Sequence, residues 1–346
     1  MLLAARCLLV SLVICAALAP GRAQDLHFSH LNAVPMQINP AYTGLTEKRA
    51  RVGVSYRSQW DNFTAGFKTA TLSADFKPHH TGNGAAGVGL FVNSDRAGDL
   101  NFGTQQIGLN GAYLMALDGG RTSVSFGLQS VFNFQRLDWT AIDAFEEERG
   151  DILANGGRAQ YLSVGTGLAL FQRLNRRVAW FVGAGGANLN RPDAGFLDDG
   201  NTGGAQLTYR RWSGHGGAEI HFGRFNSVRP SIIYLHQGPN RQMKVGSYYR
   251  FRPDRGISTD AELAAHFGAF VRHSFYNDEW TSDAIVFAVR VDWQETVITF
   301  SFDTNVSKLR VASNGVGGPE ISLVQEFDWG ERRQRRSKVE CPTFQY

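Results

Sequence analysis

One stretch of this 346-residue chain decides its fold, the segment SVSFGLQSVFNF at residues 123–134. In an extended chain its apolar side chains share one face, namely Val124, Phe126, Leu128, Phe132 and Phe134. Its polar side chains share the opposite face, namely Ser123, Ser125, Gln129 and Asn133. Apolar residues that recur with a period of two are typical of a β-strand with one apolar face. The same alternation recurs at 285–293, 298–303 and 321–329, whereas no long helical pattern follows residue 23.

Segments of this kind recur through the chain and predict fourteen strands. Their expected bounds are 50–60, 67–77, 84–93, 104–116, 121–137, 159–173, 177–188, 205–221, 225–236, 242–252, 259–272, 283–292, 295–304 and 319–329. An even number of strands, each able to cross a bilayer with about 10 residues, is typical of bacterial outer-membrane barrels. We therefore predict an all-β fold, a transmembrane antiparallel β-barrel of about 14 strands over residues 50–329, with an N-terminal periplasmic arm or plug.

The expected connections alternate in length, and this alternation predicts an orientation. Tight turns are expected at 117–120, 174–176 and 293–294, and longer loops at 138–158 and 189–204. Outer-membrane barrels place their short turns in the periplasm and their long loops outside. Most of the seven tryptophans lie near expected strand ends, where aromatic side chains favour the membrane interfaces. The competing interpretation is a soluble β-protein whose tryptophans belong to an ordinary core.

Residues 1–23 resemble a secretory signal peptide, because Arg6 precedes an apolar run and Ala23 offers a small residue at the cleavage site. The alternative is an N-terminal anchor helix. Removal of the signal would leave Cys341 as the one cysteine, so no internal disulfide is expected. It would also remove Arg6 and Arg22, and the formal net charge would fall from +4 to +2. So small a charge gives no reason to expect a nucleic-acid partner.

The two ends of the mature chain do not alternate and form separate segments. Residues 24–49 contain Pro35 and Pro40, and we expect them to form a periplasmic arm or a plug inside the lumen. Residues 330–346 form a basic tail that we also expect in the periplasm. This tail is either a solvated end of the chain or an electrostatic contact for a periplasmic partner.

No pattern in the sequence points to catalysis, a cofactor or a metal. The pair His79-His80, in an expected turn, would make a poor chelate without further ligands. The acidic loop 138–158 lacks the spacing of an EF-hand. The glycines of 183–186 form no phosphate loop, and in a barrel strand they more often mark a bend, a bulge or close packing of a plug. No G-x-S-x-G or H-E-x-x-H motif occurs, so we expect a protein that is not an enzyme.

Several stretches, in order along the chain, resemble one family. Near the mature N-terminus come Gln24-Asp25-Leu26-His27-Phe28-Ser29-His30 and Ile38-Asn39-Pro40-Ala41-Tyr42-Thr43-Gly44. They are followed by Tyr56-Arg57-Ser58-Gln59-Trp60, Asp95-Arg96-Ala97-Gly98, Gly317-Gly318-Pro319-Glu320-Ile321-Ser322-Leu323 and Cys341-Pro342-Thr343-Phe344. Together they resemble the PorP/SprF family, and the N-P-A-Y-x-G element is fairly specific.

The resemblance implies an outer-membrane protein of the type IX secretion system in a Gram-negative bacterium of the Bacteroidota. Members of the family assist the secretion or surface attachment of cargo with C-terminal sorting domains, and some serve the adhesins of gliding motility. The implied partners are outer-membrane lipid, periplasmic type IX secretion components and the sorting domains of cargo or adhesins. Two other functions stay open: a passive channel for hydrophobic or small solutes, and a barrel enzyme for which the sequence nominates no residues.

Under this interpretation the two ends of the mature chain hold the candidate partner-binding or plug residues. These are Phe28, Asn39, Pro40, Tyr42 and Gly44 in the arm, and Arg332, Arg333, Arg335 and Arg336 in the tail. Proline and glycine set unusual backbone dihedrals, and tyrosine brings an apolar ring with a polar tip. Contact with a periplasmic partner and simple closure of the lumen are both compatible with these residues, and we expect neither a cofactor nor a metal ion.

Overall fold

The structure is a computed structural model of the chain. It describes residues 34–46, 48–59, 66–81, 83–98, 102–136, 158–195, 206–223, 225–253, 263–276, 279–307 and 315–328. The expected signal peptide and the basic tail lie outside the described residues. So do the candidate site residues Phe28, Arg332, Arg333, Arg335 and Arg336. Their assignments therefore stay predictions.

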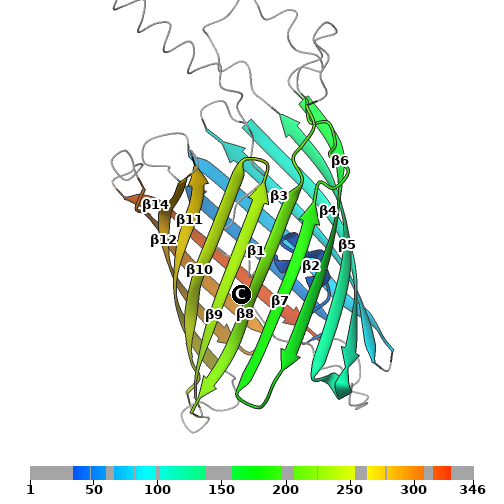
Figure 1. Ribbon diagram of the computed structural model, residues 1–346, viewed down its shortest axis with the longest axis vertical. Coiled ribbons are helices and arrows are strands. Elements are labelled where there is room, and N and C mark those ends of the chain that lie inside the picture. Colours follow the sequence, from blue (N-terminus) through cyan, green and yellow to red (C-terminus); the bar gives the residue numbers. More distant parts are fainter. Residues whose placement is uncertain are drawn as a thin grey trace, which may run out of the picture.

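Fourteen antiparallel strands form one closed barrel (Figure 1). In chain order they are β1 Ala50–Gln59, β2 Phe67–Thr81, β3 Gly84–Ala97, β4 Phe102–Leu117, β5 Thr122–Arg136, β6 Arg158–Arg173, β7 Val178–Ala187, β8 Arg211–Phe222, β9 Asn226–Gln237, β10 Asn240–Phe251, β11 Leu263–Tyr276, β12 Glu279–Trp293, β13 Thr296–Asn305 and β14 Val316–Phe327. The last strand pairs with the first, with Ala50 opposite Phe327. Closure leaves no strand edge unpaired, as hydrocarbon requires. The predicted fold class is confirmed.

Side chains along each strand alternate between the outer and the inner wall of the barrel. In β5, Phe126, Leu128 and Phe132 are between 40% and 57% exposed, whereas Ser125 and Gln129 are buried. The apolar side chains therefore face outward and the polar ones face the lumen, which is the arrangement of a barrel immersed in lipid. The period of two read from residues 123–134 is confirmed.

Helical structure is limited, within the described residues, to three short 3₁₀ helices. They are η1 Pro35–Gln37, η2 Pro40–Tyr42 and η3 Asp118–Gly120. η3 forms the turn between β4 and β5, and η2 packs against the inner wall at β4, β5 and β6. The described part of the chain contains no helix long and apolar enough to cross a membrane.

The two ends of the barrel differ in their connections. We call the end where β1 begins and β14 ends the turn side, and the opposite end the loop side. The turn side carries short connections at 82–83, 118–121, 174–177, 223–225 and 294–295, and the loop side carries long ones at 137–157 and 188–210. Because outer-membrane barrels carry their short turns in the periplasm, we expect the turn side to face the periplasm.

The predicted sorting of connections by length is wrong in three places. The turn side also carries the connection 252–262, and only two residues separate the strands of the loop side at 238–239 and at 277–278. The connection at 277–278 is short because β11 and β12 continue their ladder as far as Tyr276 and Glu279. Each added pair of residues satisfies backbone groups that a loop would leave to water.

His79 and His80 are strand residues, not turn residues as expected. β2 continues through Thr81, and the two histidines pair with Ala86 and Ala85 of β3. A shift in register between Phe76 and His79 carries the ladder past Pro78, which has no backbone N–H to donate.

The described tryptophans lie near strand ends, as predicted. Trp212 and Trp280 are near the loop side, and Trp180 and Trp293 are near the turn side. Trp212, Trp280 and Trp293 are about half exposed on the outer wall. Aromatic side chains at these two levels match the interfaces of a bilayer. Trp60, Trp139 and Trp329 lie outside the described residues.

Candidate functional site

Residues 34–46, here called the lumen segment, lie inside the barrel (Figure 1). Every residue of the segment except Gln37 is buried. Its apolar side chains pack on apolar residues of the wall, with Met36 near Phe91 and Val131 and with Tyr42 near Phe171. The expected range of the arm or plug, 24–49, extends beyond this segment to residues that the structure does not describe. The range as a whole stays a prediction.

Two prolines start the two helical turns of the lumen segment. Pro35 opens η1 and Pro40 opens η2, where the fixed φ of proline suits the first helical position and its missing N–H is not needed. Asn39 caps η2, because its side-chain Oδ1 accepts a hydrogen bond from the N–H of Ala41 at 2.9 Å. The N-P-A-Y element is therefore a capped helical turn.

The same asparagine also ties the segment to the wall. Its Nδ2 donates to the carbonyl oxygen of Leu168 in β6 at 2.8 Å and lies 3.3 Å from Nε2 of His215 in β8. The ring of Tyr42 lies edge-on to Phe171, with 5.7 Å between ring centroids, and 5.3 Å from the ring of His215. One helical turn thus contacts both β6 and β8.

Carbonyl oxygens of the lumen segment accept hydrogen bonds from side chains of the inner wall. Ser125 Oγ donates to Ala41 O at 2.6 Å. Ser213 Oγ donates to Ile38 O at 2.8 Å. Three further donors serve other carbonyls of the segment, namely Gln129 to Met36 O, Arg211 to Gln37 O and Lys77 to Thr46 O. An irregular backbone in a closed lumen needs such partners, because an unpaired buried carbonyl is costly.

Glycines of the inner wall make room for the segment. A methyl group on Gly185 of β7 would lie 2.7 Å from Ile38 O, and one on Gly183 would lie 2.9 Å from Asn39 Nδ2. Methyl groups on Gly127 of β5 and on Gly167 of β6 would overlap Pro40 and Asn39. The tract at 183–186 therefore marks close packing of the lumen segment, one of the three roles expected for it.

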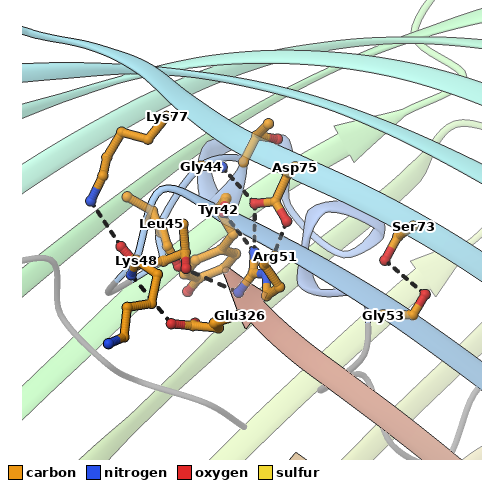
Figure 2. A network of polar contacts seen from close by, with 12 residues as sticks. Tyr42, Gly44, Leu45, Lys48, Arg51, Gly53, Ser73, Asp75, Lys77 and Glu326 are labelled. Atoms are coloured by element: carbon orange, nitrogen blue, oxygen red, sulfur yellow. Dashed lines mark hydrogen bonds and ion pairs between the residues drawn. The ribbon is translucent and has the colours of Figure 1, made fainter. Parts of the chain in front are cut away.

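A buried ion pair fixes the end of the segment near the turn side. Arg51 of β1 and Asp75 of β2 form two parallel hydrogen bonds of 2.8 and 2.9 Å, and their side chains are 6% and 1% exposed. Asp75 also accepts from the N–H of Gly44 at 2.7 Å, while Arg51 reaches the carbonyl oxygens of Leu45 and Tyr42 (Figure 2). Both charges therefore bind the wall and the segment together.

Lys48 forms a second anchor just before β1. Its Nζ donates to Glu295 Oε1 at 3.0 Å, in the turn between β12 and β13. Its N–H donates to Glu326 of β14 (Figure 2). The hydrogen bond to Glu295 raises the pKa of Lys48, and the same bond lowers the pKa of the Glu295 carboxyl. Lys48 thus links the exit of the lumen segment to the seam of the barrel.

The wall from β8 through β14 to β1 also carries clustered charges. Near the turn side, Glu219 lies 2.8 Å from Arg229 and 3.5 Å from Arg250. Toward the loop side, Asp303 lies 2.8 Å from both Arg57 and Arg272. Glycines and small polar residues therefore line the lumen where the helical turns of the segment pack, and ion pairs lie both at the end of the segment and along the rest of the wall.

Four predicted site residues meet in one place. Asn39, Pro40, Tyr42 and Gly44 all contact the inner wall within the lumen segment. The prediction missed their main charged partner, the pair of Arg51 and Asp75. The available signal was the position of these charges on the polar face of two adjacent strands, next to an expected plug.

The family model for "Type IX secretion system membrane protein PorP/SprF" matches residues 21–323 of the chain. A comparison with curated proteins found no match.

Solved structures with a similar barrel include the CymD monoaromatic hydrocarbon channel, which is 14% identical with a TM-score of 0.48, over 88% of this chain and 96% of that chain. They also include the Ralstonia pickettii toluene transporter TbuX, which is 10% identical with a TM-score of 0.48, over 85% of this chain and 94% of that chain. Neither likeness bears on what this chain binds or transports.

Proposed function

Since the chain belongs to the PorP/SprF family of type IX secretion system membrane proteins, we propose that it is a non-enzymatic barrel that assists the secretion or surface attachment of cargo with C-terminal sorting domains. Its place is the outer membrane, and membership of this system implies association with other secretion components. The proposal also includes cargo of the adhesin type and an origin of the protein in the Bacteroidota.

One observation carries the proposal: the interior of the barrel holds the chain's own lumen segment. Contacts from β1, β2, β5, β6 and β8 bind thirteen buried or half-buried residues. A wall matched in this way to its own segment supports a docking or adaptor role. It gives less support to passive passage of solutes, which needs an open lumen.

In this proposal the lumen segment closes the barrel and fixes the path of the residues before it. Phe28 and the basic tail with Arg332, Arg333, Arg335 and Arg336 then stand on the periplasmic side, where other secretion components are found. Export by the signal peptide 1–23 and contact of the outer wall with lipid belong to the same proposal.

The test is the surface proteome of a strain that lacks the gene. We expect proteins with sorting domains to disappear from the cell surface or to lose their attachment, while other outer-membrane proteins stay at their normal levels. The wild-type gene supplied in trans should restore them. An unchanged population of sorting-domain proteins at the surface would show that the proposed role is wrong.

A second arm of the experiment tests the lumen segment itself. The allele Gly127→Val places a side chain where Pro40 and Ala41 lie, whereas Gly111→Val adds one at a glycine of β4 whose Cβ position has no atom within 4 Å. We expect the first allele to restore cargo poorly and the second to restore it fully. Equal restoration of surface cargo by the two alleles would show that the packing of the lumen segment is not needed for secretion.

A further inference from the structure

A second feature of the lumen is a cavity of about 360 Å³ in the turn-side mouth. Its lining comes from Lys48, from the turn 174–177, and from the turn-side ends of strands between β6 and β14. Since these strands stand on different sides of the barrel, the cavity lies within the mouth and not on the lipid-facing wall. Its size is within the range of ordinary ligand sites.

The lining is strongly basic. Six arginines contribute, namely Arg173, Arg176, Arg229, Arg250, Arg252 and Arg290, together with Lys48. Four carboxylates face them, namely Glu219, Asp292, Glu295 and Glu326. Counted over its arginine, lysine and carboxylate side chains, the lining has a formal net charge of +3. The protein walls around the mouth have a low dielectric constant and focus the electrostatic field of this excess positive charge. The field attracts ligands of negative charge.

The carboxylates of the lining are already bound. Asp292 accepts two hydrogen bonds from Arg290, at 2.6 and 3.0 Å, and Glu295 accepts from Lys48. Glu219 is held by Arg229 and Arg250. The Nε of Arg250 is nevertheless buried without a hydrogen-bond acceptor. An acceptor brought by a ligand would remove the cost of that unpaired donor.

We propose that this mouth binds an acidic peptide segment of a periplasmic partner, through carboxylate groups that pair with its arginines. Arginine suits this task because its planar fork binds carboxylates with two parallel hydrogen bonds. The cations come from several strands and from a turn, so they match charges distributed along an extended chain better than a single small anion. Lipid headgroups are separated from the site by the barrel wall.

The chain's own tail is a poor occupant, although it follows β14 at this end of the barrel. Residues 329–346 carry four arginines and one lysine against two glutamates, so their charge has the same sign as that of the cavity. The connection that follows Arg252 holds Asp254, Asp260 and Glu262. Occupation of the cavity by that connection would leave no room for an added acidic peptide, and the experiment below would then overturn the proposal.

The test is binding of fluorescein-labelled hexaglutamate to the purified full chain in detergent, followed by fluorescence anisotropy. Hexaglutamine with the same label is the uncharged control. The decisive comparison uses two neighbours in one exposed turn: Arg176 lines the cavity and Arg177 does not. Arg176→Gln and Arg177→Gln make the same change in charge, and retention of the mobility shift on heating in detergent gels shows that each variant is folded.

We expect hexaglutamate to bind at 50 mM salt, to weaken at 500 mM salt, and to bind better than hexaglutamine. Arg176→Gln should weaken binding by about twofold, since one solvent-accessible ion pair is lost, and the double variant Arg176→Gln/Arg252→Gln should weaken it by about fivefold. Arg177→Gln should leave it unchanged. Equal weakening by Arg177→Gln, equal binding of hexaglutamine, or no binding would overturn the proposal. Displacement of hexaglutamate by an equal concentration of inorganic phosphate would also overturn the proposal, because the site would then bind any small anion as well as it binds an acidic peptide.

This inference goes beyond the proposed secretion role and fails separately from it. Loss of cargo from the surface of the deletion strain, with no binding of hexaglutamate, would support the role and overturn the acidic-peptide site. Binding of hexaglutamate, with cargo unchanged at the surface of the deletion strain, would support the acidic-peptide site and overturn the secretion role.

Discussion

The backbones of Gly44 and Gly87 pass so close that a methyl group on Gly44 would lie 2.6 Å from the Cα of Gly87. Gly44 also has a φ of +72°, which disfavours any other residue. Gly87 belongs to β3 and Gly44 to the lumen segment, so the contact joins the wall and the segment through backbone alone. Neither position tolerates a side chain while the segment is in place.

The first prediction concerns Gly87→Ala. The new methyl group would overlap Thr43 O, so we expect a loss of stability of about 1–3 kcal/mol, as for an overpacked core. Gly111→Ala is the matched control, because a methyl group there meets no atom within 4 Å. Denaturant unfolding in micelles measures both variants. Equal stabilities would show that the close contact does not constrain the wall.

The second prediction concerns the buried ion pair. Arg51→Gln leaves the carboxylate of Asp75 without its two charged hydrogen bonds, and we expect a loss of about 3–5 kcal/mol of stability. Arg49→Gln removes an exposed partner of Asp328, 3.6 Å away, and should cost at most about 1 kcal/mol. The unfolding midpoints of the two variants measure this difference. A similarly small effect of both changes would contradict the anchoring role of Arg51.

A third prediction separates the two hydrogen bonds of Asn39. Asn39→Asp keeps an oxygen to cap η2 but sets a carboxylate oxygen against Leu168 O, so we expect a loss of about 1–3 kcal/mol. Asn175→Asp, in an exposed turn, keeps the oxygen that accepts from the N–H groups of Arg177 and Val178 and should be nearly neutral. Thermal unfolding of the two variants gives the answer, and an unaffected Asn39→Asp protein would mean that only the cap matters.

The fourth prediction addresses closure of the lumen. Replacement of residues 34–46 by a Gly-Ser linker of equal length removes the buried contacts with the wall, and we expect ion conductance in planar bilayers to rise well above that of the wild type. The Gly111→Ala protein should stay at the wild-type level. A wild-type protein that already conducts steadily, at the level of the linker variant, would revive the channel interpretation.

The fifth prediction concerns pH and the pair Lys48–Glu295. The pKa of Glu295 is lowered, so its contribution to stability is full above about 4.5 and is lost as the pH falls through the lowered value. The pKa of Lys48 is raised, so its contribution is full below about 10.5 and is lost as the pH rises through the raised value. A double-mutant cycle with Lys48→Met and Glu295→Gln should give about 0.2–1 kcal/mol near pH 7, and the coupling should shrink as the pH falls below about 4.5 through the lowered pKa of Glu295. A coupling that stays unchanged down to the pH at which the barrel unfolds would contradict the ion pair.

The barrel itself could be predicted because its signal repeats. Residues 123–134 alternate on a period of two, and each strand repeats that pattern with its own apolar and polar faces. Strand ends were less predictable, since pairing with a neighbour decides how far a ladder continues. β8 begins at Arg211 and not at 205, because Leu207 forms only an isolated bridge with Asp193.

The site was predictable only in part. The motif at Asn39 to Gly44 pointed to the arm, because proline, glycine and a capping residue leave local signals. The pairing of Arg51 with Asp75, and the meeting of Arg173 with Arg290 in one mouth, depend on which strands close the barrel. No local pattern specifies those neighbours.

The position of the lumen segment is compatible with an order of assembly in which the segment packs before the barrel closes. Its polar partners lie on the early strands up to β8, whereas the seam between β1 and β14 forms only when the last strand has been delivered. A sheet of the first eight strands therefore already offers the polar partners of the segment, whereas the apolar contacts near Val297 and Val324 are added when β13 and β14 close the barrel. The lumen segment can thus act as an internal template around which the remaining strands pack.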